Sequence, residues 1–129
     1  MASNRSGGRF VRVLAPLAMM AAIFYFSSQP FEGPDLAWWE VALRKLGHLV
    51  GYAILASLWW WALIGRVRHP LALAAAISIA YAATDEYHQT FTDNRHGSAL
   101  DVGIDALGVA LACLAVHLRW PRPRAAGET

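Results

Sequence analysis

Four short groups of polar residues in this sequence have side chains that could do chemistry, and each group lies at the edge of an apolar run. In chain order they are Ser27, Ser28 and Gln29; Lys45, His48 and Tyr52; Tyr81, Asp85, Glu86, His88 and Gln89; and, after Arg95, Asp101 and Asp105. Spacings of three and four residues place side chains on one face of a helix. The pattern therefore predicts carboxylates, imidazoles and hydroxyls concentrated on a few helical faces.

These residue types would support two kinds of chemistry. Asp85 with His88, and Asp101 with Asp105, would offer ligands one helical turn apart, and His48 could join them in a mixed nitrogen and oxygen site for a divalent metal ion. The spacing matches no recognised metal motif. A histidine beside carboxylates would alternatively serve as a general acid or base. The predicted metal ligands are Asp85, His88, Asp101 and His48, and no other cofactor is evident.

The candidate residues divide by role. The candidate catalytic residues are Asp85, Glu86, His88 and Asp101. The candidate substrate-binding residues are Ser28, Gln29, Lys45, His48, Tyr52, Gln89, Arg95 and Asp105. Ser27 and Ser28 are possible nucleophiles, although no Gly-x-Ser-x-Gly motif surrounds them. The alternative is a structural network in which ion pairs tie the helix ends together, but such a tie seldom needs so many buried acids.

Long apolar runs must position these groups. Hydrophobic residues make up 57% of the chain and charged residues 16%, against roughly 25% charged in a soluble domain. We therefore expect one all-α integral membrane domain over residues 1–129, a bundle of four transmembrane helices. Each helix should approach the ~20 residues that cross a hydrocarbon core of ~30 Å. The predicted helices are 11–28, 46–64, 70–89 and 99–118, and the predicted flexible tails are 1–10 and 119–129.

The connection between the first two helices contains paired tryptophans. Asp35 could cap a short helix through Trp38, Trp39 and Leu43 that lies at the lipid headgroups. An irregular loop is the alternative. Elsewhere, four glycines are expected to let helices approach closely: Gly47, Gly51, Gly103 and Gly108. Cys113 is the single cysteine, so no internal disulfide is possible.

Basic residues predict the orientation. Eight of them flank the helices on one side, namely Arg5, Arg9, Arg12, Arg66, Arg68, Arg119, Arg122 and Arg124, and three lie on the other, namely Arg44, Lys45 and Arg95. The positive-inside rule then places both termini in the cytoplasm. Because the basic residues flank apolar runs and do not form one cationic face, the net charge of +2 does not indicate nucleic acid as a partner.

In this orientation the four polar groups converge at the extracytoplasmic end of the bundle. An Asp at the centre of a membrane helix costs ~2.5–3.5 kcal/mol on insertion scales, and less toward the helix ends. Membrane carboxylates usually face the bundle interior and mark a functional site. The acids therefore predict a functional site at that end.

The chain resembles the VanZ-like family of small bacterial membrane proteins, which is named for a member linked to low-level teicoplanin resistance. The resemblance covers about residues 10–118. Its motifs are Phe26-Ser27-Ser28-Gln29-Pro30, Lys45-x-x-His48-x-x-x-Tyr52, the run from Thr84 to Phe91, Arg95, and Asp101-Val102-x-x-Asp105-x-x-Gly108. The chain departs from the family pattern at Asp93-Asn94, where Pro-Gly is common, at Asp105, where Asn is frequent, and at Ala112, where a second Gly is expected.

The resemblance implies a multi-pass protein of the bacterial cytoplasmic membrane. The function we expect is binding or modification of a lipid or lipid-linked cell-wall component at the outer polar site, with an effect on glycopeptide (teicoplanin) susceptibility. A non-catalytic accessory module is the alternative, and a small transporter ranks last because no polar route continues inward. The expected partners are the lipid bilayer and either a lipid-linked substrate or a glycopeptide. Enzymatic activity and oligomeric state stay open.

Overall fold

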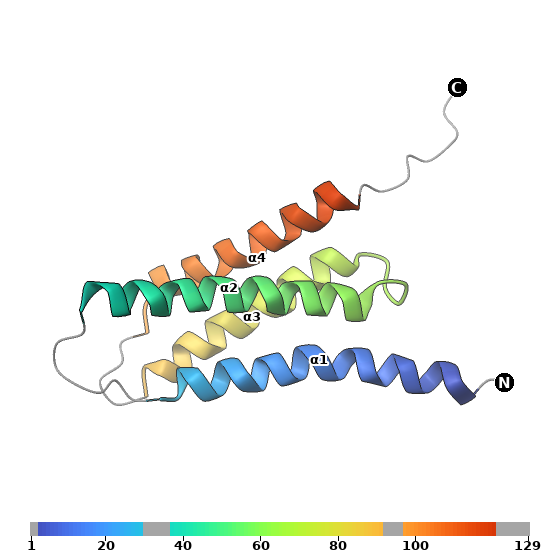
Figure 1. Ribbon diagram of the computed structural model, residues 1–129, viewed down its shortest axis with the longest axis horizontal. Helices are drawn as coiled ribbons and strands as arrows, with labels where there is room; N and C mark the ends of the chain where they lie inside the picture. Colours follow the sequence, from blue (N-terminus) through green and yellow to red (C-terminus); the bar gives the residue numbers. More distant parts are fainter. Residues whose placement is uncertain (1–2, 30–36, 92–96, 121–129) are drawn as a thin grey trace, which may run out of the picture.

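The computed structural model describes residues 3–29, 37–91 and 97–120. These residues form four α-helices and no strand, which confirms the predicted all-α architecture. The helices are α1 (Ser3–Ser27), α2 (Trp38–Leu63), α3 (Pro70–Gln89) and α4 (Ala99–Arg119). Figure 1 shows that the last turn of α1, the first turn of α2, the last turn of α3 and the first turn of α4 share one end of the bundle. The first turn of α1 and the last turn of α4 lie at the other end (Figure 1).

Two predicted boundaries were wrong. Helix α1 begins at Ser3, so much of the tail predicted over residues 1–10 is helical. Glycines 7 and 8 each weaken a helix by only about 1 kcal/mol, and extending an existing helix avoids the cost of nucleation. Helix α2 begins at Trp38 instead of residue 46. The separate interfacial helix is therefore absent from the described chain, because no Gly or Pro breaks the run from Trp38 to Lys45.

Local signals account for the other helix ends. Gly65 follows the end of α2 with a left-handed φ of 74°, and Pro70 occupies the first turn of α3. Ser98 caps α4, because the Asp101 N–H donates to its hydroxyl oxygen at 3.2 Å. The predicted bounds of α3 and α4 were consequently correct to within a residue. Asp35, the predicted cap of the interfacial helix, lies outside the described residues.

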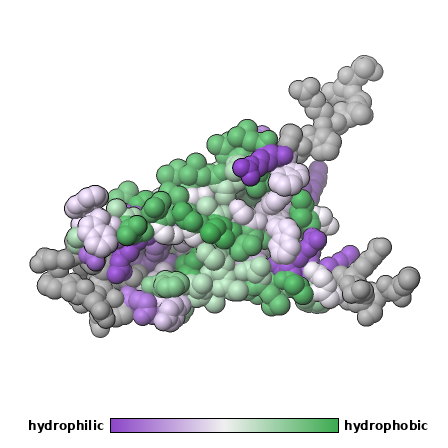
Figure 2. Space-filling model, viewed as in Figure 1, coloured by the Kyte–Doolittle hydropathy of each residue, from purple (hydrophilic) through white to green (hydrophobic). Residues whose placement is uncertain are grey.

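Three of the described helices, α1 (from Gly7), α2 and α4, are long and apolar enough to cross a membrane. Their large apolar side chains point outward, as Leu107, Leu111 and Leu114 of α4 illustrate. Hydrophobic residues cover the middle of the face in Figure 2, and hydrophilic residues gather at its two ends. Soluble monomers rarely expose an apolar surface of this extent, whereas lipid tails would cover it.

Helix α2 lies at the centre of the bundle and contacts each of the other three helices. Its approach to α4 is close, because a Cβ atom at Gly108 would collide with the Leu49 backbone. Gly51 faces Met19 and Ile23 of α1 at ordinary contact distance. Added Cβ atoms at positions 47 and 103 would meet open space. The expectation of close helix approach was therefore right at Gly108 and wrong at Gly47 and Gly103.

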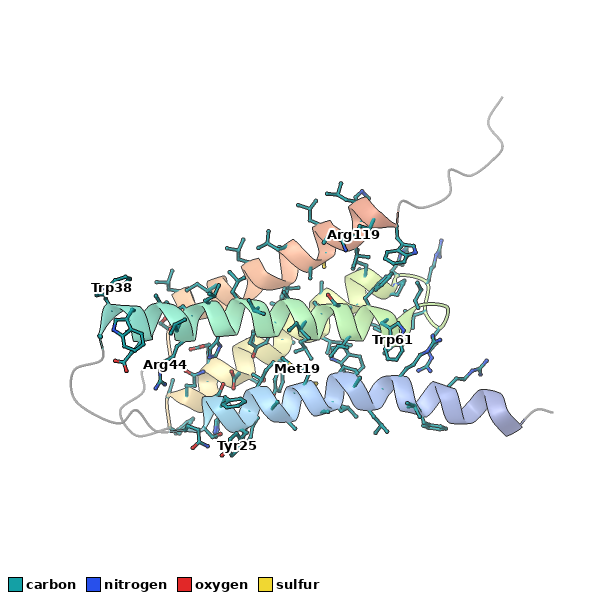
Figure 3. The ribbon with its side chains drawn as sticks, viewed as in Figure 1. Met19, Tyr25, Trp38, Arg44, Trp61 and Arg119 are labelled. Carbon is teal, nitrogen blue, oxygen red and sulfur yellow. The ribbon has the colours of Figure 1, made fainter. Side chains whose placement is uncertain are left out.

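Aromatic and basic residues join the helices at the end opposite the polar groups. The Arg12 guanidinium lies 5.2 Å from the centre of the Trp61 ring, and the Trp60 and Trp120 rings are 5.5 Å apart. Arg66 donates to the backbone carbonyl of Arg9. Figure 3 places Trp61 and Arg119 at this end and Tyr25, Trp38 and Arg44 at the other.

Candidate functional site

The structure brings the polar groups of all four helices together at one end of the bundle. Six of their side chains are almost fully buried there, with exposed fractions of 7% or less: Ser27, Tyr52, Asp85, Glu86, Gln89 and Asp105. Each helix contributes at the turns nearest that end, so the site depends on how the four helices pack. The opposite half of the described bundle buries mainly small and apolar residues, with Ser78 as a polar exception.

Asp85 of α3 ties three helices together. Its Oδ2 accepts a hydrogen bond from Ser27 Oγ of α1 at 2.7 Å and a longer one from Tyr52 Oη of α2 at 3.3 Å. Its Oδ1 is buried and has no hydrogen-bond partner among the described residues. Two hydroxyl donors stabilise the carboxylate, and the second oxygen stays available to another group.

Asp105 of α4 is fully buried and has fewer partners. His48 Nδ1 of α2 lies 3.3 Å from Asp105 Oδ1, within ion-pair range but without the alignment of a hydrogen bond. Neither carboxylate oxygen of Asp105 has a hydrogen-bond partner within the described ranges. Ligand atoms of His48, Glu86 and Asp105 all lie within 4.8 Å of one another. This trio is therefore the part of the site best arranged to hold a cation.

Glu86 is held in that trio by the start of α4. Its Oε2 accepts a hydrogen bond from the Ser98 backbone N–H at 3.2 Å. A Cβ atom at Gly97 would collide with the Glu86 carbonyl oxygen, so the chain before α4 packs directly against the end of α3. Glycine at position 97 therefore allows the contact that positions Glu86.

Lys45 and Asp101 form a separate, half-buried ion pair. Lys45 Nζ lies 2.5 Å from Asp101 Oδ1, and Ser98 Oγ donates to Asp101 Oδ2 at 2.7 Å. Asp101 thus has partners for both oxygens, unlike Asp105. This pair behaves as the structural tie between helix ends that was the alternative interpretation of the sequence.

The remaining candidates lie at the edge of the site. His88 Nε2 lies 3.3 Å from Ser28 Oγ, and its ring packs against Phe24. Gln29 is exposed and donates to the Tyr25 carbonyl. Gln89 is buried, and its Nε2 has no hydrogen-bond partner in the described part of the chain. Arg95 lies outside the described residues.

The structure groups the acids and histidines differently from the predicted metal set. Asp85, His88 and Asp101 do not join His48 in a group of close ligand atoms within the described ranges, whereas Glu86 and Asp105 do. Sequence reasoning also missed Ser98, although a serine three residues before an acid at the start of an apolar run is a capping signal. Ser27, which the sequence indicated only as a possible nucleophile, donates to Asp85 in the structure.

The arrangement can do two things chemically. Unpartnered carboxylate oxygens on Asp85 and Asp105 can accept hydrogen bonds from a ligand or coordinate a cation. The imidazole of His48 can contribute a nitrogen ligand or exchange a proton with Asp105. Both depend on α2, α3 and α4, which supply His48, Glu86 and Asp105 respectively.

Comparison with known proteins agrees with the motifs. The family model described as VanZ/LLP1 matches residues 10–120, a span that contains all four polar groups. No curated protein and no solved structure matches the chain. The match confirms the resemblance drawn from the motifs. The chain therefore belongs to the VanZ/LLP1 family.

Proposed function

We propose that this chain is a multi-pass protein of the bacterial cytoplasmic membrane that binds a lipid or lipid-linked cell-wall component at its polar end. In this proposal α3 is the fourth membrane span, both termini are cytoplasmic, and the polar end faces outward. The observation that carries the proposal is the burial of Asp85 and Asp105 with carboxylate oxygens that lack hydrogen-bond partners among the described residues.

Unsatisfied buried acids argue for a ligand. Burying a charged group without partners is costly, and native proteins satisfy nearly all buried polar atoms. The Lys45–Asp101 pair illustrates what a purely structural tie looks like, since both Asp101 oxygens are occupied. Asp85 Oδ1 and the Asp105 carboxylate are not satisfied in that way. Ionisable residues of membrane helices that face the bundle interior usually mark a site.

The surroundings of the polar end favour a lipid over a soluble ligand. Large aromatic side chains are exposed at the same end of the bundle as the acids, including Phe26, Tyr87 and Phe91, each about 70% exposed. An acyl or isoprenoid chain can lie along such a surface while its polar head reaches the buried carboxylates. This amphipathic combination supports a lipid-linked ligand.

The proposal is tested by native mass spectrometry of protein extracted into lipid nanodiscs without detergent. We expect wild type to retain a discrete lipid adduct and Asp85→Asn to retain at most a tenth of it. A tenfold loss corresponds to about 1.4 kcal/mol of binding free energy. The Asn side chain is isosteric and can still accept from Ser27, so the variant should fold. Glu40→Gln, which removes an acid from the same end of the bundle, is the matched control and should keep the adduct.

Either of two results would contradict the proposal: no discrete lipid on folded wild type, or equal adducts on wild type and Asp85→Asn. The expected effect on teicoplanin susceptibility belongs to the same proposal. Expression of wild type in a bacterial host should shift the inhibitory concentration, and expression of Asp85→Asn to the same level should not. A shift of equal size with the variant would show that the effect on drug susceptibility does not depend on the polar site.

A further inference from the structure

His48, Glu86 and Asp105 come from three different helices, yet their ligand atoms lie within 4.8 Å of one another. A tetrahedral site with bonds of about 2.1 Å places its ligand atoms about 3.4 Å apart. The flexible Glu86 side chain can close this difference by rotation. The trio therefore already has nearly the spacing that one bound cation requires.

Asp105 supplies a separate indication that something is held there. It is 0% exposed, and neither of its oxygens makes a hydrogen bond to a described residue. His48 Nδ1, which is itself one of the trio, lies 3.3 Å from Asp105 Oδ1. A fully buried carboxylate aimed at two other ligand groups is the arrangement expected of a cation site.

The acids at this end outnumber the described cations that pair with them. Lys45 is already paired with Asp101, and His48 lies beside Asp105. Among the described residues, the donors to Asp85 and Glu86 are neutral: the hydroxyls of Ser27 and Tyr52 and the backbone N–H of Ser98. A divalent cation would offset this negative charge in a place where water cannot screen it.

Resting on the function proposed above, whose site it shares, we propose that His48, Glu86 and Asp105 hold one divalent transition-metal cation of the Zn²⁺ class. One imidazole and two carboxylates form a mixed donor set that suits zinc better than magnesium or calcium, which prefer oxygen ligands alone. The Ser98 N–H holds one Glu86 oxygen and leaves the other for the metal. Three protein ligands leave a fourth position open to a ligand from outside the chain.

The test uses full-length protein in nanodiscs, stripped with a chelator and then titrated with Zn²⁺ alone. We expect one zinc per chain by native mass spectrometry and isothermal titration calorimetry. His48→Gln, Glu86→Gln and Asp105→Asn should each weaken zinc binding by more than about 100-fold, the upper end of the loss seen when an outer hydrogen-bond partner is removed. Thermal unfolding checks that each variant is folded. If Asp105→Asn does not fold, the test rests on His48→Gln, because the His48 side chain is only partly buried and its replacement should disturb the fold less.

The matched controls are His88→Gln and Asp101→Asn, which remove the same residue types from the same end of the bundle. Retention of zinc in both controls, with loss in the trio variants, supports the site. Folded wild type that takes up no zinc, or equal loss in the controls and the trio variants, overturns it. Lipid adducts recorded before and after the zinc titration separate the two proposals. Wild type that carries lipid but takes up no zinc refutes only the metal site, and wild type that takes up zinc but carries no lipid refutes only the lipid function.

Discussion

Asp85 and Asp105 are buried to the same extent but have different neighbours. Two hydroxyls on neighbouring helices donate to Asp85, so this residue holds α1 and α2 against α3. Asp105 faces a histidine and a second carboxylate, so it is suited to bind and not to tie helices. Asp85 thus ties helices through Oδ2 while its Oδ1 has no partner among the described residues, whereas both oxygens of Asp105 lack a hydrogen-bond partner there.

The role of Asp85 as a tie leads to a prediction about the two adjacent serines. Ser27→Ala removes the 2.7 Å donor to a buried carboxylate and should lower the free energy of unfolding by about 1–3 kcal/mol. Ser28→Ala is the control, because that half-buried hydroxyl donates to the Phe24 carbonyl one turn earlier and makes only a longer, 3.3 Å contact with His88 of α3. Reversible unfolding in SDS, followed by circular dichroism, measures both. Equal losses in the two variants would argue against the tie.

Helix α2 is the element on which the site is assembled. Its 26 residues span about 39 Å, more than the ~30 Å of a hydrocarbon core. The first turns, with Trp38 and Trp39 exposed, therefore reach the headgroup level when Trp59, Trp60 and Trp61 lie near the other surface. A single continuous helix also keeps Lys45, His48 and Tyr52 in one register, so they face α3 and α4 together.

The close crossing of α2 and α4 depends on one glycine, which gives a prediction at this scale. Gly108→Ala would push a methyl group into the Leu49 backbone, and the resulting overpacking should destabilise the protein by about 1–3 kcal/mol. Because Asp105 lies one turn away, zinc binding should fall as well. Gly103→Ala, whose methyl group meets open space, should stay within about 1 kcal/mol of wild type. Thermal unfolding in nanodiscs compares the pair, and similar melting points would contradict the predicted role of Gly108.

At the scale of the whole molecule, the described bundle is an apolar belt between two polar ends (Figure 2). One end carries the acids and His48, and the other carries Arg12, Arg66, Trp60, Trp61 and Trp120. Among the described helices α3 is the one not apolar enough to count as a membrane span by composition, because its last turns contain Asp85, Glu86, His88 and Gln89. Its position beside α2 and α4 supports a full crossing all the same.

The proposed topology predicts opposite labelling of the two ends of α3. In a Cys113→Ser background, Thr90→Cys should react with a membrane-impermeant maleimide on intact bacterial cells, and Val67→Cys should react only after the cells are permeabilised. Both positions are exposed in the structure. Labelling of Val67→Cys alone on intact cells would show that the orientation is the opposite of the proposed one. Labelling of both positions would show that α3 does not cross the membrane.

Much of this protein can be read from its sequence because apolar runs, caps and helix breakers act locally. The four helices, the ends of α3 and α4 at Pro70, Gln89 and Ser98, and the VanZ-like motifs all follow from residues close together in the chain. The early start of α1 was missed because its first turns are polar and contain two glycines. The early start of α2 was missed because the run from Trp38 was predicted as a separate interfacial helix.

Only the tertiary structure decides which polar residues meet. The sequence alone, through spacing on single helices, favoured Asp85, His88, Asp101 and His48 as one metal set. The structure instead pairs Asp101 with Lys45 and groups His48 with Glu86 and Asp105. The reason is physical: which residues of different helices meet depends on how each helix is rotated about its own axis and how far it is shifted along the bundle. Those are set by packing contacts, such as Gly108 against Leu49, that no local pattern encodes.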